Sequence, residues 1–233
     1  MAVQNVTRAD TESNRLKMTY EEFLKWANED THAEWVDGEV IIHMPANEYH
    51  QSTLTFLLQI LNLFVNLFDL GKVLVAPFAM RAESDGPHRE PDILFIGREN
   101  LHRLSESQLS GPADLVVELI SDDSVRCDRY DKFHEYRLAG IREYWIIDPR
   151  PGRKRADFYY LNEQSQYELF ATEDEEQVAS RVLPGFWLRP SWLWEVEDRD
   201  PLLTFFEIRG LSHEQAQQIQ QTLQTGSTEE KKD

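Results

Sequence analysis

The sequence predicts an α/β chain in which a mixed β-sheet is flanked by helices, with extra β-hairpins at both ends. Three apolar runs rich in Val, Ile, Leu and Phe follow a long helical stretch, and a fourth follows a second helix. This order of helix, three strands, helix and strand is typical of a mixed sheet covered by helices. The content of 41% hydrophobic and 28% charged residues is ordinary for a globular chain of 233 residues.

The first predicted elements are a helix and a hairpin. The stretch TYEEFLKWANED predicts a helix, because Thr19 and Glu22 match a capping box. In AEWVDGEVIIHM, the pair Asp37-Gly38 separates two alternating runs and predicts a tight hairpin turn, which requires positive φ. Residues 1–17 lack the apolar stretch of a secretory signal, so we interpret them as a disordered leader.

The centre of the chain predicts a long helix followed by strands. Residues 50–70 form a periodic apolar stretch that predicts a largely buried helix ending at Gly71. Polar residues at spacings of three and four interrupt the stretch as one stripe, which argues against a membrane span: Thr55, Gln59, Asn62 and Asn66. The runs KVLVAPFAMR, EPDILFIG and ADLVVELI then predict three successive strands.

The remaining segments complete one predicted domain. Residues 124–139 predict a helix stopped by Gly140, and REYWIID predicts another buried strand. Short strands are expected from Arg153 to Val196, including the Trp-rich VLPGFWLRPSWLWEV, and a short helix is expected at EQAQQIQQTLQ. We therefore expect one domain over residues 18–198 and a partly helical tail over 199–233.

The charge balance restricts the partners. The chain has 24 Lys and Arg against 42 Asp and Glu, a formal net charge of −18 that repels nucleic acid as a whole. Residues 126–155 differ, because nine basic residues outnumber five acidic ones there, a local net charge of +4. This region is either a docking patch for phosphates or a solvated helix face followed by a basic turn. The single cysteine, Cys127, allows no intrachain disulfide, so we expect a reducing compartment, the cytoplasm.

Two carboxylates stand out because they lie in apolar strands. Glu118 interrupts the run ADLVVELIS, and Asp92 in EPDILFI stands where its strand enters the core. A charge in such surroundings needs a partner, a proton or a metal ion. If the two strands are neighbours, the carboxylates converge and provide oxygen ligands of the kind that magnesium requires. The alternative is structural: Asp92 faces solvent at a strand end, or the acids pair with an arginine, with Arg81, Arg89 or Arg126 as candidates.

A lysine on the following helix is the third candidate. In RCDRYDKFHEYRLAG, Lys132 shares one helix face with Arg129 and Tyr136, at spacings of three and four. Phe133 is expected to turn toward the core, which places Lys132 near the boundary between core and solvent. Considered alone, such a lysine is an ordinary solvated charge. Its place directly after the strand that carries Glu118 favours a role in a site.

The ordered set of motifs resembles the PD-(D/E)XK nuclease superfamily and, more narrowly, the Uma-type family of restriction endonucleases. The matching pieces span roughly residues 18–198: EWVDGEVI with Glu34, Asp37 and Glu39, His50 before the long helix, EPDILFI, GPADLVVELIS, DKFHEYRLAGIREYWIIDP and LPGFWL. The superfamily's acid-x-lysine signature would place a lysine where this chain has Ile120. The Uma-type proteins resemble this sequence in carrying a lysine on the next helix, which matches Lys132.

The resemblance implies a restriction-endonuclease-like fold and a metal-dependent endonuclease that hydrolyses phosphodiester bonds, with DNA as the expected substrate. Asp92 and Glu118, with Glu39 from the hairpin, would hold Mg²⁺ or Mn²⁺, and Lys132 would orient water or stabilise the transition state. His50 is a further candidate for a direct role. Glu39 as a solvent-facing hairpin acid and His50 as a helix cap or core-edge residue are the alternatives. A homodimer is expected on the same basis.

Two other classes of function remain open. The first is a non-catalytic interaction module that keeps the fold, in which Glu118 forms a buried ion pair and the polar-striped helix mediates a homodimer. The second is a nuclease for RNA or for small phosphodiesters, which the acidic composition makes worth testing. The sequence contains neither a glycine-rich phosphate loop nor a GxSxG elbow, and its histidines do not complete a zinc-binding helix.

Overall fold

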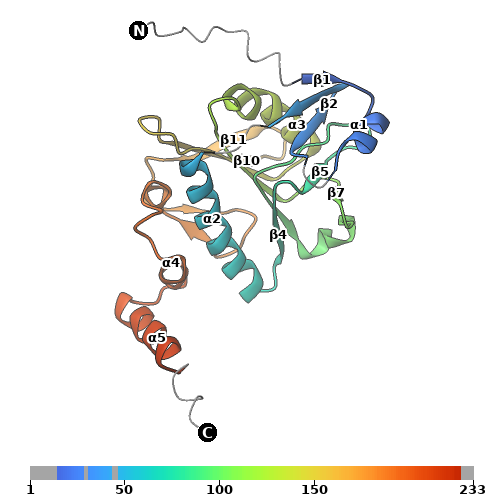
Figure 1. The fold of residues 1–233 in the computed structure, drawn as a ribbon. Helices are drawn as coiled ribbons and strands as arrows, with labels where there is room; N and C mark the ends of the chain where they lie inside the picture. Colours follow the sequence, from blue (N-terminus) through green and yellow to red (C-terminus); the bar gives the residue numbers. More distant parts are fainter. Residues whose placement is uncertain (1–14, 29–30, 44–46, 227–233) are drawn as a thin grey trace, which may run out of the picture.

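The centre of the structure is a mixed six-stranded sheet, seen in the middle of Figure 1. A computed structural model describes residues 15–28, 31–43 and 47–226. The strands of this sheet are β4 (Gly71–Val75), β6 (Ile93–Gly97), β8 (Leu115–Leu119), β9 (Glu143–Asp148), β10 (Arg155–Leu161) and β11 (Tyr167–Thr172). Their order is β11-β10-β9-β8-β6-β4. β8 and β9 pair in parallel, and the other neighbours are antiparallel.

The parallel pair requires a crossover, and the helical segment after β8 provides it. This segment starts as a π-helix, η3 (Cys127–Asp131), and continues as α3 (Lys132–Ala139). Gly140 ends it with φ of 82°, a left-handed conformation that favours glycine. The mixed sheet flanked by helices confirms the predicted fold class.

Each face of the sheet packs against its own layer. In β6, β8 and β9, odd-numbered residues such as Ile93 and Val117 face the larger core, and even-numbered residues such as Leu94 and Val116 face a second core beneath α3. Glu118 has the same parity as Val116, so its side chain is on the α3 side. The larger core is covered by two helices, α2 (Glu48–Leu67) and α4 (Pro201–Ile208).

A small sheet formed by the N-terminal part of the chain lies beside the central one. Its strand order is β1-β3-β2, and Phe23, Ala33 and Val40 form its core. Backbone hydrogen bonds between Trp35 and His88 join it to the segment that leads into β6. The elements are β1 (Arg15–Lys17), α1 (Tyr20–Trp26), β2 (Ala33–Val36) and β3 (Glu39–Ile42).

Local signals at this end are confirmed. The Thr19 side chain accepts a hydrogen bond from the Glu22 N–H, and the Thr19 N–H donates to the Glu22 carboxylate at 2.8 Å, which completes the capping box. Asp37 and Gly38 have φ of 48° and 87°, as a tight hairpin turn requires. The predicted leader is too long, because residues 15–17 pair with β3. Residues 1–14 lie outside the described part of the chain.

Two predicted boundaries in the centre are wrong. The run KVLVAPFAMR breaks at Pro77, which has no N–H for a ladder, into β4 and β5 (Ala79–Arg81). β5 pairs in parallel with β7 (Gln108–Ser110) from the predicted loop, which also contains the 3-10 helix η2 (Arg98–Arg103).

The helix α2 ends at Leu67, not Gly71, and Asp69 takes the left-handed conformation with φ of 53°. Gly71 instead begins β4, where a Cβ atom would collide with the Ile96 carbonyl oxygen.

The C-terminal part is less strand-like than predicted. The Trp-rich segment forms the two-residue strand β13 (Trp187–Leu188), paired with β12 (Val178–Ala179), and then the 3-10 helix η4 (Pro190–Trp194). The predicted tail helix is confirmed as α5 (His213–Gly226). Among the described helices, none is long and apolar enough to cross a membrane.

We predict that His88 makes the fold sensitive to mild acid. Its side chain is 9% exposed and faces the Tyr20 hydroxyl and the Phe23 ring, and burial lowers its pKa from 6.5 to about 4. Between these values the unfolded chain binds a proton that the folded chain does not, so stability is lost as the pH falls below 6.5. Urea unfolding at pH 7.5 and pH 5 is expected to show about 2 kcal/mol more loss for the wild type than for His88→Gln. Equal losses in both proteins would contradict this.

Candidate active site

The structure brings Asp92, Glu118 and Lys132 together at one end of the sheet. Asp92 directly precedes β6, and extending the register of Ile93 with Val117 by one pair places Asp92 opposite Glu118. The Leu119 N–H donates to Asp92 Oδ2 at 2.7 Å, which fixes this carboxylate against the end of β8. The expected convergence of the two strand acids is therefore observed in the geometry.

Glu118 is buried and bonded to two side chains of the helix above it. It is 2% exposed, and its Oε1 atom accepts hydrogen bonds from the Lys132 ammonium at 2.9 Å and the Tyr136 hydroxyl at 2.8 Å. Lys132 and Tyr136 are four residues apart and share one helix face, as predicted. Arg129, expected on the same face, pairs with Asp157 instead.

Lys132 is more deeply buried than its sequence context predicts. It is 4% exposed, whereas a position near the boundary with solvent was expected. Its Nζ atom lies 2.9 Å from Glu118, 3.1 Å from Glu34 and 3.4 Å from Asp128. An ammonium group has three donors, so one lysine in this pocket faces three carboxylates.

Glu34 and Arg89 belong to the site, although the sequence named Glu34 only as part of a motif and Arg89 only as a possible partner of Asp92 or Glu118, whereas it pairs with Glu34. Glu34 on β2 is fully buried, and its Oε2 atom lies 2.8 Å from Arg89 Nη1. The Arg89 guanidinium also binds Glu135 on α3. Glu34 occurs in the motif EWVDGEVI, but that motif contains several acids, and only the packing of the small sheet on the central one selects Glu34.

Of the two remaining predicted site residues, His50 lies at the site and Glu39 lies away from it. Glu39 is not part of the cluster: its carboxylate lies 3.0 Å from Arg15 and 4.0 Å from Lys17, both on β1. His50, near the start of α2, is brought to the site, with its Nε2 atom 3.3 Å from Asp92 Oδ2. The hairpin therefore contributes Glu34 to the site, and not Glu39.

Burial and charge shift the pKa values in opposite directions within the cluster. Burial, with Asp128 and Asp92 nearby, raises the pKa of Glu118 well above its usual value despite Lys132. Burial also acts to raise the pKa of Glu34, but Lys132 and Arg89 outweigh it and hold that pKa well below the usual value. Glu118 and Glu34 overcome the burial of Lys132 and raise its pKa, so the lysine stays charged at neutral pH.

The donor set fits a magnesium or manganese ion. Among the described residues, nothing donates a hydrogen bond to Glu118 Oε2 or Asp92 Oδ1, and Asp128 Oδ1 is buried without a hydrogen-bond partner. Within the described segments, no group of three or more His, Cys, Asp or Glu side chains is placed to hold a metal ion. Mg²⁺ commonly binds one or two carboxylates and completes its shell with water and substrate phosphate, so two strand acids with free oxygens suffice.

Comparison with known proteins agrees with the fold and identifies the family. A solved structure described as a putative nuclease belonging to DUF820 from Anabaena variabilis ATCC 29413 superposes with a TM-score of 0.62 at 17% identity, over 77% of this chain and 98% of that one. At this identity, the likeness shows the fold. No curated protein gives a match to the chain. The model of the Uma2 family, described as "Putative restriction endonuclease", matches residues 20–191. The chain therefore belongs to the Uma2 family.

Proposed function

We propose that the protein is a metal-dependent endonuclease that hydrolyses phosphodiester bonds, with DNA as its substrate. The observation that carries the proposal is the convergence of Asp92 and Glu118 at the end of two adjacent strands, with Lys132 bonded to Glu118 at 2.9 Å. Membership of the Uma2 family and the shared fold support the same reaction class.

Asp92 and Glu118 would hold the ion through the carboxylate oxygens that no described residue occupies. Bound there, Mg²⁺ or Mn²⁺ would lower the pKa of a water molecule and neutralise charge on the scissile phosphate. Hydrolysis forms a bond from the water oxygen to phosphorus, breaks the bond to the leaving oxygen and transfers a proton to that oxygen. Lys132 stabilises the added negative charge, and His50 orients Asp92 through their 3.3 Å contact.

The basic region around residues 126–155 supports a docking role at one place. Most of its basic side chains are occupied, because Lys132 is buried and the following pair with carboxylates: Arg129, Arg142, Arg150 and Arg155. Arg153 and Lys154 are exposed, and the described residues offer them no ion pair. They lie in the turn between β9 and β10. Since β9 runs parallel to β8, this turn lies beyond the same end of the sheet as Glu118.

One observation favours the non-catalytic alternative. Lys132 already pairs with Glu118, and an interaction module would need the cluster only as a buried ion pair. The two functions differ in metal binding, which the interaction module does not require. A substrate panel separates DNA from RNA and small phosphodiesters.

A reducing compartment such as the cytoplasm fits the single thiol, Cys127, whose pKa burial raises to about 12.

We predict that Asp92→Asn and Glu118→Gln each weaken Mn²⁺ binding by about tenfold or more, because each removes a charged ligand oxygen. Glu39→Gln is the matched control, since this carboxylate pairs with Arg15 away from the cluster. Calorimetry measures the binding, and nicking of supercoiled plasmid with Mn²⁺ measures the activity. The proposal fails if wild-type protein binds no ion, or if all four proteins nick equally, which would reveal a contaminant.

We predict that Lys132→Met destabilises the fold by about 3–5 kcal/mol, because it leaves buried carboxylates without their cation. Adding Glu118→Gln is expected to recover part of this loss, since a neutral amide at 118 needs no counter-charge. Urea unfolding of both single variants and the double variant gives the coupling energy. Additive effects would show that the ammonium and the Glu118 carboxylate do not interact.

We predict that Arg153→Ala/Lys154→Ala weakens DNA binding and lowers the salt slope by about 2, one unit for each lost phosphate contact. The control is Lys72→Ala/Arg98→Ala, which removes the same charges at the opposite end of the sheet, where Gly71 pairs with Gly97. Fluorescence anisotropy of a labelled duplex, measured in a Glu118→Gln background to prevent cleavage, follows the affinity. Equal slopes for the two variants would rule out a docking role of the turn.

A further inference from the structure

The C-terminal helices form an appendage outside the residues that match the family. The match ends at residue 191, whereas α4 and α5 span Pro201–Ile208 and His213–Gly226. α4 is part of the body, because Phe205 and Ile208 belong to the larger core. α5 packs against α4 and projects from the body at the lower left of Figure 1. Only α5 is therefore an appendage, and neither the core nor the candidate active site accounts for its presence.

α5 buries very little of its own surface. Ala216 is buried, but Ile219 and Leu223 are 38% and 61% exposed. These three residues are spaced by three and four, so they form one apolar stripe along the helix. A helix of 14 residues is marginal on its own, and packing of its apolar face provides most of its stability. Ala216 packs toward α4, whereas Ile219 and Leu223, the exposed part of the stripe, are not covered by the described residues.

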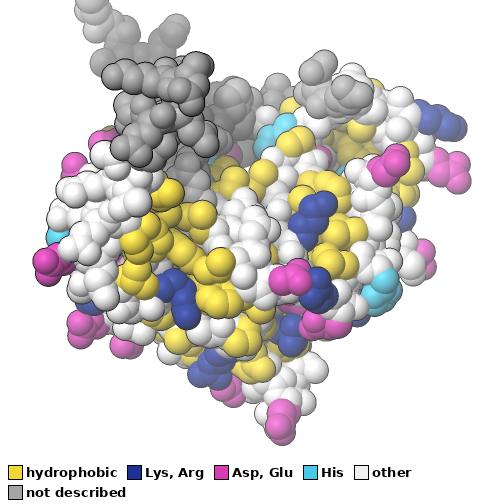
Figure 2. Space-filling view, turned by 90° about the horizontal axis from the view of Figure 1, so that it is seen from below, with side chains coloured by type: hydrophobic (Ala, Val, Ile, Leu, Met, Phe, Trp, Pro, Cys, Tyr) yellow, Lys and Arg dark blue, Asp and Glu magenta, His cyan; other side chains and the backbone are white. Residues whose placement is uncertain are grey.

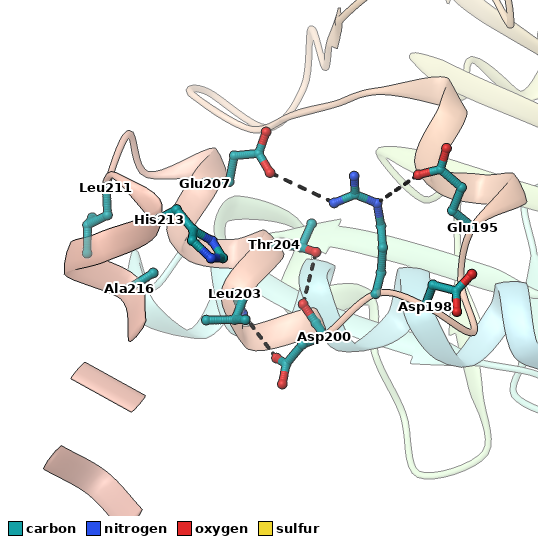
Figure 3. Close-up of a pocket in the computed structure, with 10 residues that line it drawn as sticks. Glu195, Asp198, Asp200, Leu203, Thr204, Glu207, Leu211, His213 and Ala216 are labelled. Carbon is teal, nitrogen blue, oxygen red and sulfur yellow. Dashed lines mark hydrogen bonds and ion pairs between the residues drawn. The ribbon is translucent and has the colours of Figure 1, made fainter. Parts of the chain in front are cut away.

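Two hollows adjoin the stripe. One, of about 440 Å³, is lined by Leu211, Gln215, Gln218, Ile219, Thr222 and Leu223. The other, of about 630 Å³, lies between α4 and α5. In it Arg199 reaches toward Glu195 and Glu207, and Asp200 caps α4 (Figure 3). Two acids of the second hollow pair with Arg199 and Asp200 caps α4, so among its described acids only Asp198 lacks a side-chain partner, and one exposed carboxylate does not make a ligand site. The apolar stripe remains the feature to explain.

The absence of charged residues along the exposed stripe favours an uncharged partner face, such as the same stripe of a second copy. The chain carries a net charge of −18, so two copies repel each other over most of their surfaces. Residues 215–228 contain no charged residue, and the stripe is flanked by glutamines, including Gln215 and Gln218. An amide both donates and accepts hydrogen bonds, so two identical glutamine-flanked faces satisfy each other. A charged partner would find no complementary group there.

We propose that α5 pairs with α5 of a second copy, so that the protein forms a two-fold dimer through Ile219 and Leu223. A two-fold interface uses the same patch on both copies, which a neutral, self-complementary stripe allows.

Apolar side chains also gather on the face seen from below in Figure 2. At the end of α2, Leu67 and Phe68 are 62% and 40% exposed, and Arg209 at the end of α4 lies 4.5 Å from the Phe68 ring.

The dimer is expected to be weak and dependent on salt. Two paired 14-residue helices present less surface than a standard interface of about 800 Å² per partner, so we expect weak association. Salt screens the repulsion between two acidic copies, and dimerisation should therefore strengthen between low and moderate ionic strength.

Analytical ultracentrifugation of the full chain over a concentration series tests the proposal. The disrupting variant is Ile219→Glu/Leu223→Glu, and the matched control is Gln217→Glu/Gln221→Glu, which adds the same charge to the opposite side of the same helix. We expect the disrupting variant to weaken dimerisation by tenfold or more and the control to change it several-fold less. Ile219→Gln/Leu223→Gln keeps the helix propensity and adds no charge. This variant is expected to weaken the dimer as well.

Three outcomes would overturn the proposal. These are a wild-type protein that stays monomeric up to hundreds of micromolar, an apolar-stripe variant that dimerises like the wild type, and equal weakening by the disrupting and control variants. Circular dichroism of each variant verifies that α5 stays helical. Metal binding by Asp92 and Glu118 is measured on the same samples and does not depend on the dimer, so a failure here is distinguishable from a failure of the proposed function.

Discussion

The buried ammonium of Lys132 is the interaction on which the rest of the site depends. It lies within 3.4 Å of three carboxylates, from β2, β8 and the π-helix η3. Each of these acids alone would cost several kcal/mol in an apolar interior. The lysine makes their burial tolerable, and it leaves one oxygen of Glu118 without a donor. A metal ion is the kind of ligand that completes such an arrangement of excess negative charge.

The same cluster holds distant parts of the chain together. Glu34 binds both Lys132 and Arg89, and Arg89 binds Glu135, so charged side chains attach the small N-terminal sheet to α3. Hydrophobic contacts alone would leave this sheet with the small core around Phe23 and Val40. The N-terminal hairpin is therefore part of the site's support, although it lies outside the central sheet.

Features that depend on neighbouring residues could be predicted from the sequence. Features that depend on contacts between distant segments could not. The capping box at Thr19 and the turn at Asp37-Gly38 depend on neighbouring residues and were predicted correctly. Glu118 and Lys132 could be proposed as site residues for the same reason, because a strand acid and a lysine on the next helix are close in sequence. Glu34 required knowledge of how two sheets pack. The break at Pro77, the end of α2 before Asp69 and the π-helix reflect tertiary fit that no short motif encodes.

The parallel pairing of β8 with β9 has a consequence for the order in which the candidate site forms during synthesis. The ribosome must complete the crossover and β9 before β8 gains its second neighbour, and contacts of such long sequence separation form slowly. A chain made only as far as β8 carries Asp92 and Glu118 without Lys132, so the two acids lack the ammonium group that lies 2.9 Å from Glu118 in the folded protein. The complete cluster can therefore assemble only after the crossover helix that carries Lys132 has been made.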